Sequence, residues 1–370
     1  MPRNRIIYNA LSLYVGQNDA VTGSHSNAND IKQVSRVQSF DEDFSRNLTQ
    51  VNQYGNLAAI DRIELEAPTV KASYSYFMTD GGNEKYIGLN VTTGSQAAVS
   101  CVSGYLNKVT DQKNYFLVIA DEGNDTVGYK NSRTGVIGLG NAYLTSYDIE
   151  AAVGSIPKAT VNLEALNICV YSSVDGTNNV PAVVPTNGVP VTGLPFLIPV
   201  AKANDNSAQA TALQPGDLTL SIPSGLIGVS SSDLKIQNFK LSVPLSRQPI
   251  RRLGDKFAFT REIQWPVRTT FSIDAEMGDL AINDGYSGNL ANVLCDTGVY
   301  TISVAFAKPS CAGEGLGTPA LRYEFRGAKL LSQKVNTSIG ANAKFSAEFE
   351  AQIGAPQDTT NGIFISGSYQ

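Results

Sequence analysis

The chain has 370 residues, which exceeds the size at which one hydrophobic core usually stops growing, so two domains are expected. A hydrophobic fraction of 42% with 16% charged residues excludes an intrinsically disordered chain, and 33 Gly with 16 Pro indicate many turns. The formal net charge of -5 argues against a protein that grips nucleic acid, because such affinity comes from clustered Lys and Arg. Apolar runs fall short of the roughly 18 to 20 residues of a membrane helix, so we expect a soluble chain without membrane insertion.

Alternating apolar and polar residues predict two similar strands far apart in the chain. Residues 70–76 place Val70 and Tyr74 on one face, and residues 267–273 do the same with Val267 and Phe271. This alternation is typical of strands with one buried face. Each range also begins near a proline, a residue that strands tolerate at their first position.

A longer segment, residues 143–165, can be laid on residues 329–351 without a gap. The identical residues are Leu144, Ser146, Gly154, Lys158, Glu164 and Ala165 in the first segment and Leu330, Ser332, Gly340, Lys344, Glu350 and Ala351 in the second. After the shared glycine both segments alternate, with charged and polar residues on one face. The match predicts a strand pair that occurs twice.

A third, less regular match lies nearer the start of each half. Residues 37–40 face residues 236–239, and small gaps are needed beyond them. The further facing pairs are Ser45-Arg46 with Ser246-Arg247 and Tyr54-Gly55 with Leu253-Gly254. The three matches keep their order and lie roughly 186 to 201 residues apart, which is what a tandem duplication with unequal loops leaves.

These patterns predict a mainly β protein with two tandem β-sandwich modules, each with little helix. We place the first module at residues 1–171, an extended Pro-rich and polar connector at 172–214, and the second module at 215–370. Five prolines between positions 181 and 199 exclude a helix or a central strand from the connector. The best candidate for a helix is residues 279–295.

Motifs for catalysis, cofactor binding or metal binding are missing from the sequence. The single histidine, His25, lies in a loop-like run, where adjacent serines do not take the geometry of a catalytic triad. The glycine-rich runs 135–140 and 313–317 lack the lysine of a phosphate-binding loop, and the acidic run 121–125 lacks the spacing of a calcium loop. The four cysteines show no short paired spacing, so free thiols are expected. We expect no enzyme, no cofactor and no metal site.

Two stretches of opposite charge occupy corresponding parts of the two modules. The acidic stretch contains Asp41, Glu42, Asp43, Glu64 and Glu66, and the basic stretch contains Arg247, Arg251, Arg252, Lys256, Arg261 and Arg268. Either these are independent solvated surfaces, or modules of one chain or of neighbouring chains meet with opposite signs and so fix their order in an assembly. DNA binding by the basic stretch is a third interpretation, although Phe257 and Phe259 are its only interleaved aromatic residues.

Three segments resemble those of bacteriophage major tail tube proteins. They are residues 36–40 leading to 52–55, residues 67–76 followed by 80–84, and residues 325–330 leading through 339–342 to the closing strand. The resemblance lies in strand patterns and turn phrases, not in a diagnostic motif. It implies a tail-tube-like β-sandwich whose inner strands join those of neighbours into a closed tube. Since most members carry one module and form six-membered rings, two modules imply three chains per ring.

The resemblance further implies a structural subunit of the virion tail, made and assembled in the host cytoplasm, whose stacked trimeric, pseudo-hexameric rings conduct DNA during ejection. Its partners would be further copies of itself, a tape-measure protein, tail tip or terminator proteins, and a sheath if the tail is contractile. Double-stranded DNA would pass without tight binding, because an acidic wall does not hold a polyanion.

We expect the ring interface to involve strand edges and both charged stretches. The candidate interface residues are Asp41, Glu42, Asp43, Arg247, Arg251, Arg252, Val70, Tyr74, Phe271 and Phe345. An alternative function is a two-domain β-sandwich adhesin, binding or decoration protein displayed on a virion. A β-sandwich enzyme is a third class, for which the sequence offers no constellation of catalytic residues.

Overall fold

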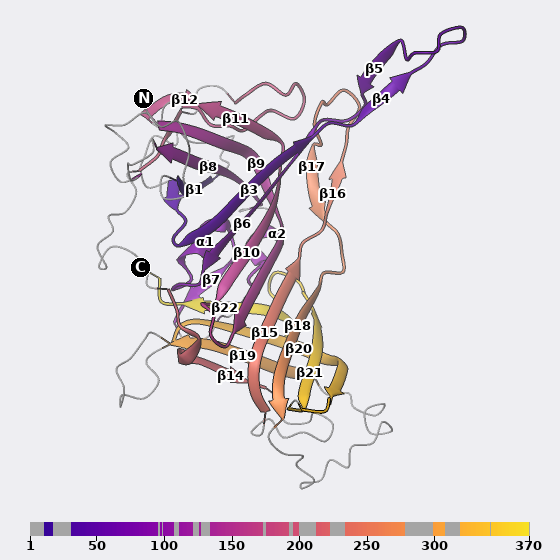
Figure 1. Cartoon of the computed structure of the whole chain (residues 1–370). Coiled ribbons are helices and arrows are strands. Elements are labelled where there is room, and N and C mark those ends of the chain that lie inside the picture. The colour runs from indigo at the N-terminus through magenta and orange to yellow at the C-terminus, as the bar shows by residue number, and fades with distance from the viewer. Residues whose placement is uncertain are drawn as a thin grey trace.

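The computed structural model confirms a mainly β protein (Figure 1). It describes residues 11–17, 31–94, 97, 99–106, 111–120, 126, 134–172, 175–191, 195–199, 212–222, 234–277, 299–307, 319–340 and 342–369. Helix in these residues is limited to α1 (Gly82–Ile87), α2 (Ser103–Leu106), a 3-10 turn at Pro215–Asp217 and the single 3-10 residue Thr126. The candidate helix at 279–295 lies outside the described residues. In the described part of the chain no helix is long and apolar enough to span a membrane.

Eight strands form one antiparallel sheet that runs through both halves of the chain. Their order is β3 (Val37–Ser45), β6 (Thr69–Phe77), β10 (Lys158–Ala165), β9 (Thr134–Ala152), β15 (Leu234–Pro244), β18 (Arg268–Met277), β21 (Lys344–Gln352) and β20 (Pro319–Asn336). The first four strands belong to the first half and the last four to the second. The pairing of β9 with β15 therefore joins the halves into one sheet, which we call the main sheet.

The two longest strands each leave the main sheet and enter a second layer. β9 bends near Asn141, which has φ 50°, and β20 bends at Gly327, which has φ 73°. A side chain at Gly327 would be strained, and its Cβ would lie 2.3 Å from Oδ1 of Asn361. The bends let each strand contribute to both layers of a sandwich.

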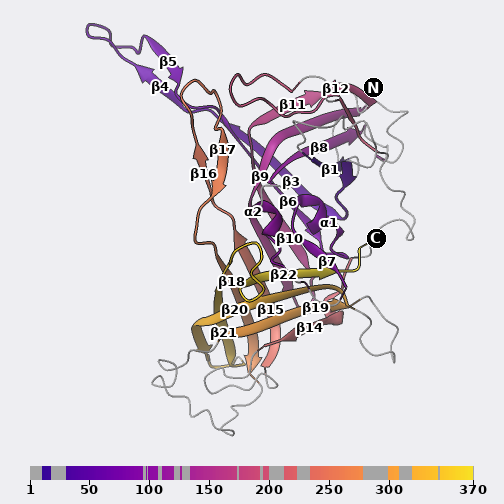
Figure 2. The ribbon, with the colours of Figure 1, turned by 180° about the vertical axis from the view of Figure 1, so that it is seen from behind.

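Second layers made of further strands cross the main sheet on one side (Figure 2). In the first half they are β8 (Gln112–Ala120), β11 (Asn167–Tyr171), β1 (Leu11–Gln17) and β2 (Ile31–Gln33). In the second half they are β19 (Tyr300–Ala307), β22 (Gly362–Gly367), β14 (Leu218–Ser221) and β7 (Val91–Thr93), which pairs in parallel with β22. Since β7 comes from the first half, the halves are also joined at this layer.

The core lies between the layers, on the apolar face that the alternation predicts. In β10 and β21 every second residue is buried, including Val161 and Phe349. The halves fill the same position with opposite sizes: Ala159 faces Tyr76 across the strands, whereas Phe345 faces Ala275. Close packing of an interior requires such compensation when one partner grows.

The halves repeat the same pairings in the same registers. The β9–β10 and β20–β21 pairs each carry a bulge, after Leu144 in one and after Leu330 in the other. The two connecting turns contain Gly154 and Gly340, with φ of 80° and 84°. We call two residues matched when they hold the same place in these registers, as Leu144 and Leu330 do.

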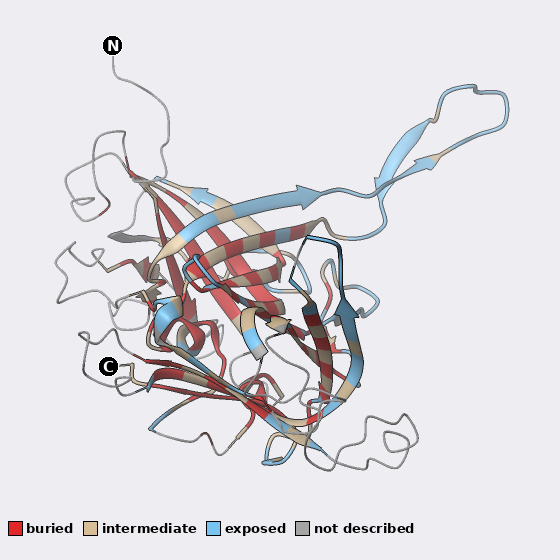
Figure 3. Cartoon of the chain, turned by 60° about the horizontal axis from the view of Figure 1, so that its bottom comes forward, coloured by how far each residue is buried: buried red, intermediate tan, exposed pale blue. Residues whose placement is uncertain are grey.

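Each half also carries a β-hairpin between its first two main-sheet strands. The first consists of β4 (Leu48–Val51) and β5 (Asp61–Glu64), and the second of β16 (Arg247–Ile250) and β17 (Thr260–Ile263). The first projects from the molecule with nearly all of its residues exposed (Figure 3). Another short pair, β12 (Asp175–Asn179) with β13 (Pro195–Leu197), lies in the connector.

The registers correct one facing pair expected from the sequence. Leu48 pairs with Glu64 in the first hairpin as Arg247 pairs with Ile263 in the second, so Leu48, not Arg46, is matched to Arg247. No gap is needed through this region. The sequence match was misled by the Ser-Arg dipeptide, which identity favours but strand pairing does not.

Candidate functional site

The junction inside the chain is a fully formed contact between two strand edges. β15 pairs with β9 over seven residues, and Leu241 lies opposite Ile149 on the buried face. On the other face Lys240 lies opposite Glu150, and Oγ of Ser242 donates a hydrogen bond to Oδ1 of Asp148 at 2.5 Å. Opposite charges in directly opposed positions stabilise a strand pair. In this junction a paired strand edge has apolar residues buried on one face and complementary polar or charged residues opposite each other on the other face.

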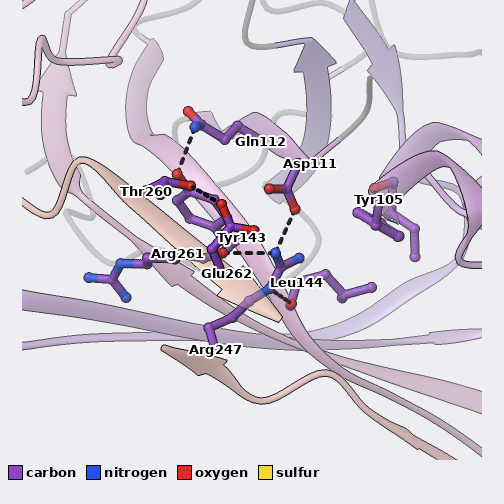
Figure 4. Close-up of polar contacts among 10 residues, drawn as sticks. Tyr105, Asp111, Gln112, Tyr143, Leu144, Arg247, Thr260, Arg261 and Glu262 are labelled. Carbon is purple, nitrogen blue, oxygen red and sulfur yellow. Dashed lines mark hydrogen bonds and ion pairs between the residues drawn. The ribbon is translucent and has the colours of Figure 1, made fainter. Parts of the chain in front are cut away.

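The second hairpin strengthens this junction through Arg247, which begins β16 (Figure 4). Nη1 of Arg247 lies 2.6 Å from Oδ1 of Asp111, and its Nε donates to the carbonyl oxygen of Leu144. The guanidinium also lies over the Tyr143 ring at 5.3 Å from the centroid. Arg247 is therefore a buried tie between the hairpin and the first half.

Two further ion pairs connect the same parts of the chain. On β17, Nη1 of Arg261 lies 2.5 Å from Oε2 of Glu164 on β10. Arg251, which directly follows β16, pairs with Glu66, which follows β5, and a side-chain hydrogen bond from Arg251 lowers the pKa of the Glu66 carboxyl. Basic residues of the second half thus meet acidic residues of the first within one chain.

A buried carboxylate lies where the two halves meet in the core. Oε1 of Glu84, on α1, accepts hydrogen bonds from the hydroxyls of Tyr76 and Tyr147, at 2.8 and 3.0 Å. Tyr323 of the second half donates to the same atom at 3.4 Å. Burial raises the pKa of Glu84, partly offset by the tyrosine hydrogen bonds. The cluster joins three strands and a helix.

The main sheet ends in two edges to which no further described strand pairs. One is the outer edge of β3, and the other is the part of β20 from Lys329 to Asn336, which pairs with β21 on one side. Exposed strand edges normally recruit a partner unless they are protected. On these edges Phe44 is 58% exposed and Val335 48% exposed.

The face of the main sheet opposite the core is polar across all eight strands. Within the described residues its carboxylates are Asp41, Asp43, Asp148, Glu150, Glu164, Asp274, Glu276, Glu348 and Glu350, and its cations are Lys71, Lys158, Lys235, Lys240, Arg268, Lys329, Lys334 and Lys344. Carboxylates and cations are nearly balanced on this face, with one more carboxylate than cations among the described residues.

The structure separates the candidate interface residues into two groups. Asp41, Glu42 and Asp43 lie exposed on the open edge strand β3, and Arg251 and Arg252 lie exposed on the second hairpin. The others are buried within one chain: Val70, Tyr74, Phe271, Phe345 and Arg247.

The placement of this second group corrects its assignment to a surface between chains. The strands β6, β18 and β21 are paired on both sides, and their alternating apolar residues fill the core. Alternation identifies the buried face of a strand but not whether its edges are free. Sequence reasoning missed Asp111, Lys334 and Glu84. It did identify Glu164 and Glu350 as identical residues of the two halves, and Glu164 is the partner of Arg261 in the structure.

Several residues weighed from the sequence lie outside the described part of the chain, among them His25, the acidic run 121–125 and the glycines at 313–317. The described residues contain no group of three or more His, Cys, Asp or Glu that would hold a metal ion. Cys101 and Cys169 are free thiols. Burial raises the pKa of the Cys101 thiol to about 12, which keeps it protonated and unreactive at neutral pH.

Together these features define a mainly β protein whose described strands form one internal junction and leave two edges of the main sheet without a further strand. No protein-family model and no curated protein match the chain. The structure of the SPP1 tail tube is similar over 46% of this chain and 81% of that chain, with 13% identity and a TM-score of 0.30. The anti-feeding prophage baseplate is similar over 46% of this chain and 97% of that chain, with 10% identity and a TM-score of 0.27.

Proposed function

We propose that this protein is a non-enzymatic structural subunit of a bacteriophage tail tube that assembles by joining the edges of its main sheet. The observation that carries the proposal is the pair of open edges, β3 and the end of β20, at opposite ends of one sheet. A sheet closed edge to edge satisfies its backbone groups and removes the edges. The assignment to a phage tail comes from the sequence resemblance to tail tube proteins.

The repeated registers support a tandem duplication and hence three chains per ring. Each chain supplies two sets of four main-sheet strands, so a ring of three contains six sets in pseudo-hexameric order. The polar face, whose charges are nearly balanced, would line the lumen, where the absence of a basic excess lets DNA slide without tight binding. The rings would stack around a tape-measure protein, with tail tip or terminator proteins at the ends and a sheath outside if the tail is contractile.

Electron microscopy and mass measurement of the purified chain test this proposal. We expect rings or tubes above a threshold concentration, with a mass of three chains per ring. A protein that stays monomeric at every concentration contradicts it and favours the adhesin or decoration protein. A ring of six chains would retain a tube but reject the pseudo-hexameric arrangement.

A further inference from the structure

We propose that β3 of one chain pairs with the end of β20 in a second copy, in the register that joins β15 to β9 inside the chain. The projecting β4–β5 hairpin then docks on β21 of that copy. The inference rests on the proposed function, because it requires assembly through the sheet edges. It adds the register, the residues in contact and the reason for the order of the modules.

The register follows from the matched strands. Val37 pairs with Tyr76 as Ile236 pairs with Ala275, and a bulge follows each pair, so β3 has the place of β15. The end of β20 likewise has the place of β9, because its pairing with β21 repeats that of β9 with β10. The open edge of β3 therefore corresponds to the edge of β15 that is satisfied in the internal junction.

Transferring the internal register to two chains places opposite charges together. In the internal junction Ser242 lies opposite Asp148. In the proposed contact Asp43 of one chain takes the place of Ser242, and Lys334 of the next chain takes the place of Asp148. In the same register Asp41 lies opposite Asn336. The charge is reversed relative to the internal junction, where the acidic residues lie on β9 rather than on the incoming strand.

This reversal penalises incorrect pairing. If β3 paired with β9, the same register would place Asp43 against Asp148 and Asp41 against Glu150. Like charges in directly opposed positions destabilise a strand pair. The charges thus favour an alternating order in which a first half meets the second half of its neighbour.

The core side of the open edges is partly apolar: in the proposed register Phe44 lies opposite Gln333, and Glu42, which is matched to Leu241, lies opposite Val335. Phe44 is matched to Val243 and Val335 to Ile149, and both Val243 and Ile149 are completely buried in the internal junction. Phe44 and Val335 lie on the core side of their own strands yet remain about half exposed. A neighbouring strand would cover both.

The hairpin supplies a second pair of charges. Arg62 is matched to Arg261, and Glu350 is matched to Glu164, the partner of Arg261. Arg62 is exposed on the projecting hairpin, and docking would bring it to Glu350 of the second copy. The residue of the first hairpin that is matched to Arg247 is Leu48, which cannot form an ion pair like that of Arg247 with Asp111. The charged contact of the first hairpin with the second copy therefore depends on Arg62.

Charge reversal tests the edge contact. Asp43→Lys and Lys334→Asp should each reduce the assembled fraction several-fold in sedimentation velocity, and the double variant should restore it. Arg62→Glu on the exposed hairpin should also weaken assembly. Asp274→Lys is the matched control, because it makes the same charge change on an exposed position of the interior strand β18; it should leave assembly within about twofold.

Cysteine pairs test the register. Oxidised Asp43→Cys/Lys334→Cys protein should form covalent multimers, whereas each single variant and the shifted pair Asp43→Cys/Asn336→Cys should not. Ser242→Cys/Asp148→Cys should close a disulfide within one chain and form no covalent multimers. Rings that form with unaltered efficiency in the charge variants, or that cross-link in the shifted register, overturn this inference and leave the tube proposal standing. Monomers at every concentration overturn both.

Discussion

Arg247 and Asp111, 136 residues apart in the sequence, form an ion pair with Nη1 and Oδ1 2.6 Å apart. The Arg247 side chain is 1% exposed and that of Asp111 12% exposed. The pair fastens the β16–β17 hairpin to the first half beside the β9–β15 junction. The internal junction thus combines the pairing of two strand edges with a buried ion pair beside it.

Removing one partner of this pair should destabilise the folded chain strongly. Asp111→Ala leaves the Arg247 guanidinium buried beside no carboxylate, and breaking such a pair costs about 3 to 5 kcal/mol. Denaturant unfolding should show the loss. Lys158→Ala, which removes the exposed pair with Glu150, should cost at most about 1 kcal/mol; equal losses in the two variants would contradict the assigned role of Arg247.

Glu84 should make stability fall with rising pH. Its folded-state pKa is raised by burial, so the folded protein holds a proton that the unfolded chain releases above about pH 4.3. The stabilisation is complete below that pH and is lost as the pH rises through the raised pKa. Glu84→Gln cannot ionise, so its stability relative to the wild type should increase with pH. Parallel stability curves for the two proteins between pH 4 and 8 would refute this.

The size-compensated pair in the core can be exchanged between the halves. Ala159→Phe should clash with Tyr76 and cost about 1 to 3 kcal/mol. Adding Tyr76→Ala recreates the arrangement of Phe345 with Ala275, so the double variant should be more stable than the sum of the single effects by about 1 to 3 kcal/mol. Tyr74→Ala is the control, because Tyr74 faces Val161. Additive effects in the first pair would mean that the positions do not share one packing site.

The two hairpins should respond differently to deletion. Replacing residues 49–63 by an Asn-Gly turn removes exposed residues, so thermal unfolding should shift little while assembly is lost. Replacing residues 248–262 removes the Arg261 pair and the hydrogen bond from Phe257 to the Pro185 carbonyl, and should lower the unfolding temperature markedly. Retained assembly after the first deletion would exclude a role for the projecting hairpin.

The sequence predicted the strands well where one face is buried. Alternation at 70–76 and 159–165 identified the apolar sides of β6 and β10, because successive side chains of a strand point to opposite faces. The gapless match of 143–165 with 329–351 holds in the structure down to the bulge. The match through Arg46 failed, since short dipeptides carry little information about register.

What the sequence by itself determined is the local pattern: β-structure, its buried faces and the positions at which the halves match. Tertiary structure alone decided which edges are satisfied and which remain open. Strand pairing joins residues far apart in the chain, so nothing in the local pattern of Val70 or Phe345 distinguishes a paired interior strand from an edge. For the same reason Arg247 and Asp111 become partners only when the hairpin folds back on the first half, whereas Asp43 and Lys334 are left at opposite ends of the sheet.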